Sequence, residues 1–155
     1  MTEKETFISV HNRECQTTLN LLKAYPADQL EMRPALKSRT ARELAFVLAN
    51  QERFFQQAAE GKMDFSLFAN QPPQTLDEII AVLGKNHKAV DEALAKTSDD
   101  DLNKLVNFGG HDMRRLDALW ANQFDLVHHR GQFSVYVRLA GAKVPSIYGP
   151  TADTV

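Results

Sequence analysis

The segment Asp125-Leu-Val-His-His-Arg-Gly-Gln132 places a carboxylate and an imidazole four residues apart. In a helix, side chains at positions i and i+4 lie on the same face with Cβ atoms roughly 6 Å apart, so Asp125 and His129 can share one small cation. A catalytic zinc-type site takes about three protein ligands and leaves one position open. The pair therefore predicts part of a metal site that needs a further ligand from another helix.

Apolar residues at helical spacing predict four long helices to position these groups. The first spans about 4–25 and ends before Pro26, and the second spans 40–61 from a Thr40–Glu43 capping box. A third opens at Thr75. The last spans 112–140, with Asp112 as its N-cap and a glycine just past its end. Almost nothing in the chain resembles a sheet.

The connection over 63–73 is too apolar to be a free linker. Its Phe65, Leu67 and Phe68 are expected to fold back onto the end of the bundle. Four amphipathic helices with connections of medium length predict an all-α four-helix bundle, because each apolar stripe must be buried against another helix. Bundles build metal and cofactor sites in their cores from facing helices.

The last helix is apolar on two sides. One stripe holds Ala118, Ala121, Asp125, His129, Gln132, Tyr136 and Leu139, and the other holds Leu116, Trp120, Val127 and Gly131. One stripe can serve the bundle core and the other a second subunit, which predicts a homodimer. Burial of both stripes within a monomer is the alternative.

Composition places the chain among single-domain, cytoplasmic proteins. Its 155 residues suit one domain, 1–155, and a single cysteine allows no intrachain disulfide. The net charge of −2 disfavours a nucleic-acid-binding surface. No apolar run reaches the roughly 18 residues that span a bilayer, so no membrane partner is expected.

The last helix and tail resemble the DinB-like superfamily. The residues that carry this resemblance are Val127-His-His-Arg-Gly-Gln-Phe-Ser-Val-Tyr-Val-Arg-Leu-Ala-Gly141, followed by Val144-Pro and Tyr148-Gly-Pro. The resemblance implies an up-down-down-up four-helix bundle, often dimeric, in which three histidines on two helices bind a divalent metal such as nickel or zinc. It also implies kinship with thiol-dependent transferases and isomerases.

Two of the three family histidines are replaced in this chain. The family's last-helix pair corresponds to Asp125 and His129, and the histidine of the second helix corresponds to Val47. A carboxylate can replace an imidazole at a borderline or hard metal, but valine has no lone pair to donate. Tight nickel or zinc binding in the family manner is therefore not expected.

Other residues can be considered as site-lining groups. His128 points about 100° away from its neighbour around the helix, so the two cannot easily bind one ion. His11 and His87 lie on apolar stripes of other helices, and Gln51 is a weak oxygen donor one turn after the valine. Each of these histidines has an alternative role as a hydrogen-bonded core residue. Cys15 lies among apolar neighbours and is interpreted as structural.

Two functions remain open. The first is a small-molecule-binding or interaction module whose ancestral metal site is reduced to Asp125 and His129, with no tightly bound cofactor. The alternative is a metal-dependent transferase or hydrolase, of the thiol-dependent transferase type, in which nickel or zinc is held by this pair and a ligand from outside the family pattern. The sequence does not identify a substrate.

Overall fold

The computed structural model describes residues 1–154, with the exception of the Phe68 side chain. Its main helices are α1 (Glu3–Lys23), α2 (Ala41–Asn50), α3 (Glu52–Glu60), α4 (Leu76–Lys96) and α6 (Arg115–Leu139). Shorter elements are η1 (Ala27–Gln29), η2 (Phe65–Ala69), α5 (Asp99–Leu102), β1 (Leu105–Phe108) and β2 (His111–Arg114).

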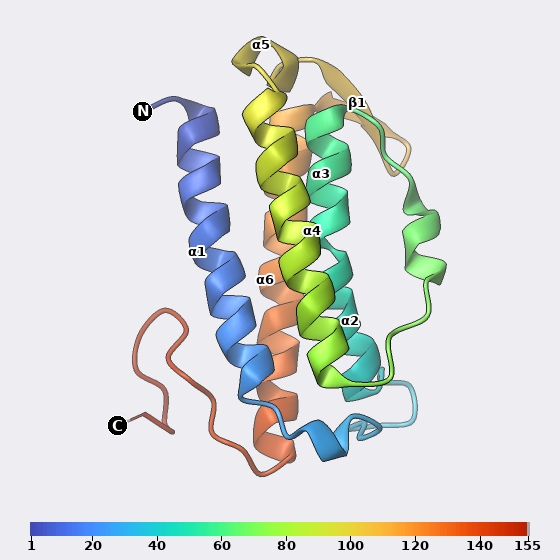
Figure 1. Cartoon of the computed structure of the whole chain (residues 1–155), viewed down its shortest axis with the longest axis vertical. Helices are drawn as coiled ribbons and strands as arrows, with labels where there is room; N and C mark the ends of the chain where they lie inside the picture. Colours follow the sequence, from blue (N-terminus) through green and yellow to red (C-terminus); the bar gives the residue numbers. More distant parts are fainter. Residues whose placement is uncertain (155) are drawn as a thin grey trace.

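The long helices form one bundle (Figure 1). Helix α1 runs down the bundle in this view, α2 and α3 run up it, α4 runs up beside them, and α6 runs down again. The crossover that carries η2 returns the chain along the bundle, which is why α3 and α4 run in the same direction. The expected four-helix bundle and its up-down-down-up order are confirmed.

Helix starts in the bundle are fixed by local hydrogen bonds. Capping boxes open α2 with Thr40 and Glu43 and α4 with Thr75 and Glu78, as the sequence predicts. In each box the threonine hydroxyl accepts from the glutamate's backbone N–H, and the glutamate carboxylate accepts from the threonine's backbone N–H. Each box satisfies two backbone donors that would otherwise lack partners.

The second predicted helix is divided into α2 and α3. Its backbone continues through Gln51, whose φ of −62° and ψ of −26° are helical, and the Gln51 N–H donates to the carbonyl of Val47. The next turn is tighter, because the N–H of Phe54 donates to the carbonyl of Gln51, three residues back. Gln51 and Glu52 are both buried at this junction.

The start of the last helix was predicted wrongly. Asp112 lies in β2 of a small hairpin and accepts a hydrogen bond from Asn107, so α6 begins only at Arg115. Gly109 and Gly110 form the two-residue turn, with φ values of +62° and +94°. Such turns need positive φ at both central residues, which glycine adopts without strain.

The buried face of α6 overlaps the predicted stripes only in part, because it shares Ala118 and Tyr136 with one and Leu116 with the other. Its buried residues are Leu116, Ala118, Leu119, Asn122, Gln123, Leu126, Arg130, Phe133, Tyr136 and Val137. Three polar residues interrupt its apolar pattern, so hydrophobic periodicity alone could not detect it. Asp125 and Leu139, assigned to one predicted stripe, are exposed.

A buried ion pair joins α6 to α1. Arg130, 1% exposed, donates to the Glu14 carboxylate at 2.5 Å and to the Glu14 backbone carbonyl at 3.0 Å. Tyr148 of the C-terminal tail hydrogen bonds to both side chains. Arg130 therefore fixes α6 to its neighbours.

The crossover packs onto the bundle as predicted for Phe65 and Leu67. Leu67 is buried, and its carbonyl accepts from the side-chain amide of Asn50. The ring of Phe65 contacts those of Phe54 and Phe108, each with centroids 5.6 Å away. The prediction for Phe68 lies outside the described side chains. None of the helices described here is long and apolar enough to cross a bilayer.

Candidate metal centre

Side chains from α1 and α4 converge on Glu52, the first residue of α3, and a side chain from α6 supports one of them. Its Oε2 atom lies 3.1 Å from His11 Nε2 on α1 and 3.0 Å from His87 Nδ1 on α4. On the other side of the first imidazole, His11 Nδ1 lies 3.0 Å from Gln123 Oε1 on α6. We call His11, Glu52 and His87 the core triad.

The core triad is enclosed. The side chains of His11 and Glu52 are fully buried, and that of His87 is 21% exposed. The rings of Phe55 and Phe7 lie 4.3 Å and 5.5 Å from the His11 ring, centroid to centroid. Apolar walls of this kind exclude water and strengthen the electrostatic interactions inside them.

The protonation of Glu52 reflects a balance between burial and hydrogen bonding. Burial by itself raises the pKa of this carboxyl, but hydrogen bonds and charge from His11 and His87 outweigh it, so the pKa lies below the ordinary value of 4.5. The carboxylate form is thus the stable one at neutral pH. A buried anion of this kind requires cationic or hydrogen-bonding partners.

His87 is shifted in the opposite direction. Its hydrogen bond to Glu52 raises its pKa above the ordinary value of 6.5, while partial burial opposes the rise and the charges of Glu52 and Asp91 add to it. The carboxylate therefore attracts a positive charge to this position. A proton on the imidazole can supply that charge, and so can a metal ion.

The donor set and spacing of the core triad fit a divalent metal. One ligand atom from each side chain lies within 4.8 Å of the others. Two imidazoles and one carboxylate are a donor set used for catalytic zinc, whose ligand atoms lie about 2.0–2.2 Å from the ion and hence, at tetrahedral angles, about 3.3–3.6 Å from each other. The two N···O distances of 3.1 Å and 3.0 Å are a few tenths of an ångström shorter, so an ion would require only a small separation of these side chains.

Unsatisfied polar atoms surround the triad. Glu52 Oε1 and Gln123 Nε2 are buried and have no hydrogen-bond partner among the described residues. Buried polar groups nearly always have partners, so each such atom calls for an explanation. The free carboxylate oxygen is a lone-pair donor that an ion can use.

Gln123 gives His11 the support that metal-ligating histidines usually have. Such histidines generally donate their second ring N–H to an oxygen, which fixes the tautomer and the ring orientation. Donation from His11 Nδ1–H to Gln123 Oε1 would orient Nε2 toward the triad, where its lone pair becomes available to an ion that replaces the hydrogen bond to Glu52. Gln123 is therefore an orienting residue for this site.

The residues at the family's metal positions form a second, more exposed group. Asp125 Oδ2 accepts a hydrogen bond of 2.6 Å from the Gln51 amide and lies 3.5 Å from His129 Nε2. Val47 lines a small cavity of about 40 Å³ together with Gln51 and Asp125. The predicted pair thus exists, and its carboxylate is engaged by Gln51.

The side chain of Gln132 links His128 and His129, and the two imidazoles do not share a position for one metal ion. The Gln132 side chain lies 3.0 Å from a ring nitrogen of each histidine. Among the described residues, no group of three histidine, cysteine, aspartate or glutamate ligands includes Asp125 or His129. His11 and His87 converge as the apolar stripes suggested, but they converge on Glu52.

Glu52 and Gln123 were missed by the sequence analysis. Glu52 occupies a helical stripe with Ala45, Leu48, Phe55 and Ala59, all of them buried. A single carboxylate on such a stripe must find partners inside the protein. The single glutamate on this apolar stripe was the signal in the sequence that could have identified Glu52 as a site residue.

Cys15 is structural, as expected. Its side chain is buried, and burial, followed by the negative charges of Glu52 and Asp91, raises the pKa of its thiol. The thiolate that nucleophilic chemistry needs is therefore disfavoured.

This bundle is similar to known proteins in both sequence and structure. A sequence profile described as the DinB family matches residues 1–154. A DinB-like protein from Bacillus cereus ATCC 10987 superposes with a TM-score of 0.82 at 25% identity, covering 93% of this chain and 97% of that one. A DinB-like protein from Bacillus subtilis, YjoA, superposes with a TM-score of 0.72 at 19% identity, covering 96% and 98%, and shows the fold alone.

Among curated proteins, this chain is 39% identical over 56 residues to the uncharacterized protein YrdA of Bacillus subtilis (strain 168). That match covers 36% of this chain and about a third, 34%, of the relative. Fold and site together define a helical bundle with a buried His–Glu–His centre that could hold a metal ion. The chain belongs to the DinB family.

Proposed function

We propose that this protein binds one divalent metal ion at the core triad, in place of the family site. The observation that carries the proposal is the convergence of His11, Glu52 and His87 at 3.0–3.1 Å in a buried setting. The family positions offer a carboxylate and one imidazole, because valine replaces the remaining donor. The core triad supplies three protein ligands, whereas the family positions supply two.

Charge also supports the proposal. Glu52 is an anion at neutral pH, and it already draws positive charge toward His87. A divalent ion replaces the protons that the two imidazoles share with the carboxylate, so binding releases protons and strengthens as pH rises. His87 is the one member with an exposed side chain, which makes the α4 side the route for the ion.

We further propose metal-dependent transfer or hydrolysis as the reaction class. The observation in favour is that three protein ligands leave a coordination position open, as catalytic sites do. A divalent ion at such a site supplies Lewis acidity, which lowers the pKa of a ligated water or thiol. The chain's own part is to orient His11 through Gln123 and to exclude bulk water with Phe7 and Phe55.

Metal analysis tests the binding site. The full chain, produced without an affinity tag, is stripped with a chelator, titrated with Zn²⁺, Ni²⁺ or Co²⁺, and analysed for bound metal. We expect about one ion per chain, with a cobalt spectrum typical of mixed nitrogen and oxygen ligands. His87→Gln should lose the ion.

A matched variant distinguishes the two candidate sites. His129→Gln removes one imidazole from the family positions and leaves the core triad intact, so it should retain the ion. Loss of metal from His129→Gln but not from His87→Gln would place the ion at the family positions and refute the proposal. Absence of binding by the wild-type chain would refute it as well.

A further inference from the structure

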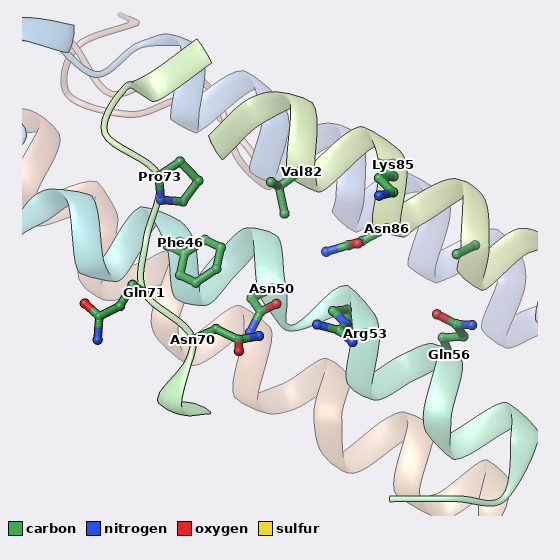
Figure 2. Close-up of a pocket in the computed structure, with 11 residues that line it drawn as sticks. Phe46, Asn50, Arg53, Gln56, Asn70, Gln71, Pro73, Val82, Lys85 and Asn86 are labelled. Carbon is green, nitrogen blue, oxygen red and sulfur yellow. The ribbon is translucent and has the colours of Figure 1, made fainter. Parts of the chain in front are cut away.

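A cleft lies on the outer side of the seam between α3 and α4, with a volume of about 640 Å³ (Figure 2). Helices α2 and α3 form one wall, α4 forms the other, and the crossover segment with Pro73 crosses one end. Binding sites for small molecules usually have volumes of about 300–1,000 Å³. The size of the cleft therefore suits a small metabolite.

The lining of the cleft carries positive charge and no carboxylate. Arg53 on α3 and Lys85 on α4 both line it, and none of the lining residues is an aspartate or glutamate. Neither cation takes part in an ion pair within 4 Å among the described residues. Hydrogen bonds from Ser66 and, to a smaller extent, the charge of Arg53 lower the pKa of Asp64, a residue that does not line the cleft. Two cations in a concave surface whose lining holds no carboxylate attract an anion.

The walls of the cleft are held in place. Asn50 donates to the backbone carbonyl of Leu67 at 3.1 Å, and Asn86 donates to that of Ala49 at 3.1 Å. The first bond ties the crossover to α2. The second bond ties α4 to the end of α2. A site with fixed walls loses less conformational entropy when a ligand binds.

The end of the cleft beneath the crossover combines apolar side chains with the amides of Asn70 and Gln71. Phe46 and Val82 line it from opposite walls, and Pro73 lies beside them (Figure 2). A ligand that spans the cleft thus meets hydrocarbon at one end and cations further along. That combination selects an anion attached to an apolar or aromatic group.

We propose that this cleft binds a small organic anion, a carboxylate or phosphate ester, with its charged group between Arg53 and Lys85 and its apolar part against Phe46. The site is separate from the core triad, although Arg53 follows Glu52 and Asn86 precedes His87 in the sequence. Consecutive helical residues point about 100° apart, so one residue of each pair faces the core and the other faces the cleft.

Titration of the full chain with phenyl phosphate and with benzoate, followed by calorimetry and by amide NMR, tests this proposal. Both probes should bind, with shifts at Asn50 and Asn86, and binding should weaken as salt rises. Benzylamine, which has the same ring and the opposite charge, should not bind. Whichever of the two anions binds more tightly identifies the preferred charged group.

The double variant Arg53→Gln, Lys85→Gln should weaken phenyl phosphate binding by about ten-fold or more, equivalent to about 1.4 kcal/mol or more. Lys88→Gln, an exposed lysine on the same helix outside the cleft, is the matched control and should leave affinity unchanged. Equal weakening by both changes, or binding of benzylamine as tight as that of benzoate, would overturn the proposal. If inorganic phosphate binds as tightly as phenyl phosphate, the apolar part of the assignment is wrong.

His87→Gln separates this proposal from the metal proposal. Because His87 does not line the cleft, the variant should still bind phenyl phosphate while losing metal. Loss of phenyl phosphate binding in a folded His87→Gln protein would mean that the anion binds at the core triad instead, and the cleft assignment would fail.

Discussion

Glu52→Gln is the most informative single change in the metal-free protein. The amide has nearly the shape of the carboxylate, so the packing around the side chain is retained while the negative charge is removed. In the wild-type chain Glu52 is fully buried and accepts from two imidazoles. Hydrogen bonds to charged groups contribute about 1.5–3 kcal/mol each, and breaking a buried charge pair costs about 3–5 kcal/mol. We therefore expect a loss of about 2–4 kcal/mol, because the amide keeps part of the hydrogen bonding.

The loss should depend on pH. The pKa of Glu52 is lowered on folding, so its contribution is present above its unfolded pKa of 4.5 and disappears as pH falls through the folded value. The pKa of His87 is raised, so its contribution is complete below its unfolded pKa of 6.5 and disappears as pH rises through the folded value. The difference between wild type and variant should thus be largest from pH 4.5 to 6.5 and smaller at high pH.

Chemical denaturation in the presence of a chelator, repeated from pH 5 to pH 9, measures this difference. For a chain of this length 1 kcal/mol corresponds to about 2–4 °C in Tm, so a thermal shift of about 4–16 °C is expected near pH 6. Glu92→Gln, an exposed glutamate on α4, is the control and should change little at any pH. A loss of the same size at every pH would refute the charge argument and leave only packing.

Three further changes follow from the structure. Arg130→Met should destabilise the protein by about 3–5 kcal/mol in urea unfolding, because it removes the buried cation that pairs with Glu14 and leaves only the exposed Arg13, 3.6 Å away, beside that carboxylate; a loss under 1 kcal/mol would contradict this. Val47→His combined with Asp125→His restores the family donors around the small α2–α6 cavity and should raise metal content from one to two ions per chain, whereas unchanged stoichiometry would show that the positions do not converge. Leu139→Lys, on an exposed part of α6, should convert the predicted homodimer to a monomer in light scattering, and a wild-type mass of 17.4 kDa would make the dimer prediction wrong.

The sequence was a good guide to the fold where local signals were strong. The Thr40–Glu43 and Thr75–Glu78 capping boxes mark helix starts by a mechanism confined to four residues, and both were predicted correctly. The hairpin was missed because each strand has only four residues, too few for an alternating pattern to be recognised. Asp112 has the chemistry of an N-cap, and only its pairing with Asn107 shows otherwise.

The candidate site was less accessible to sequence reasoning. His11 and His87 stood out because histidine is unusual on an apolar stripe. Glu52 did not, since glutamate is common on helix surfaces, and assigning it to the core requires the exact helical phase. Gln123 was hidden for the same reason, because neither predicted stripe of the last helix contained it.

The position of the junction between α2 and α3 explains how this chain can lack a family histidine and still bring three potential metal ligands together. Gln51 and Glu52 are consecutive, so they point about 100° apart around the helix. Gln51 faces α6 and donates to Asp125, whereas Glu52 faces α1 and α4 and accepts from two imidazoles. Donors at the family positions bridge α2 and α6 alone. Donors at the core triad bridge α1, α3 and α4, with Gln123 adding α6, so an ion bound there is coupled to the packing of the whole bundle, and its binding free energy adds to the stability of the folded chain.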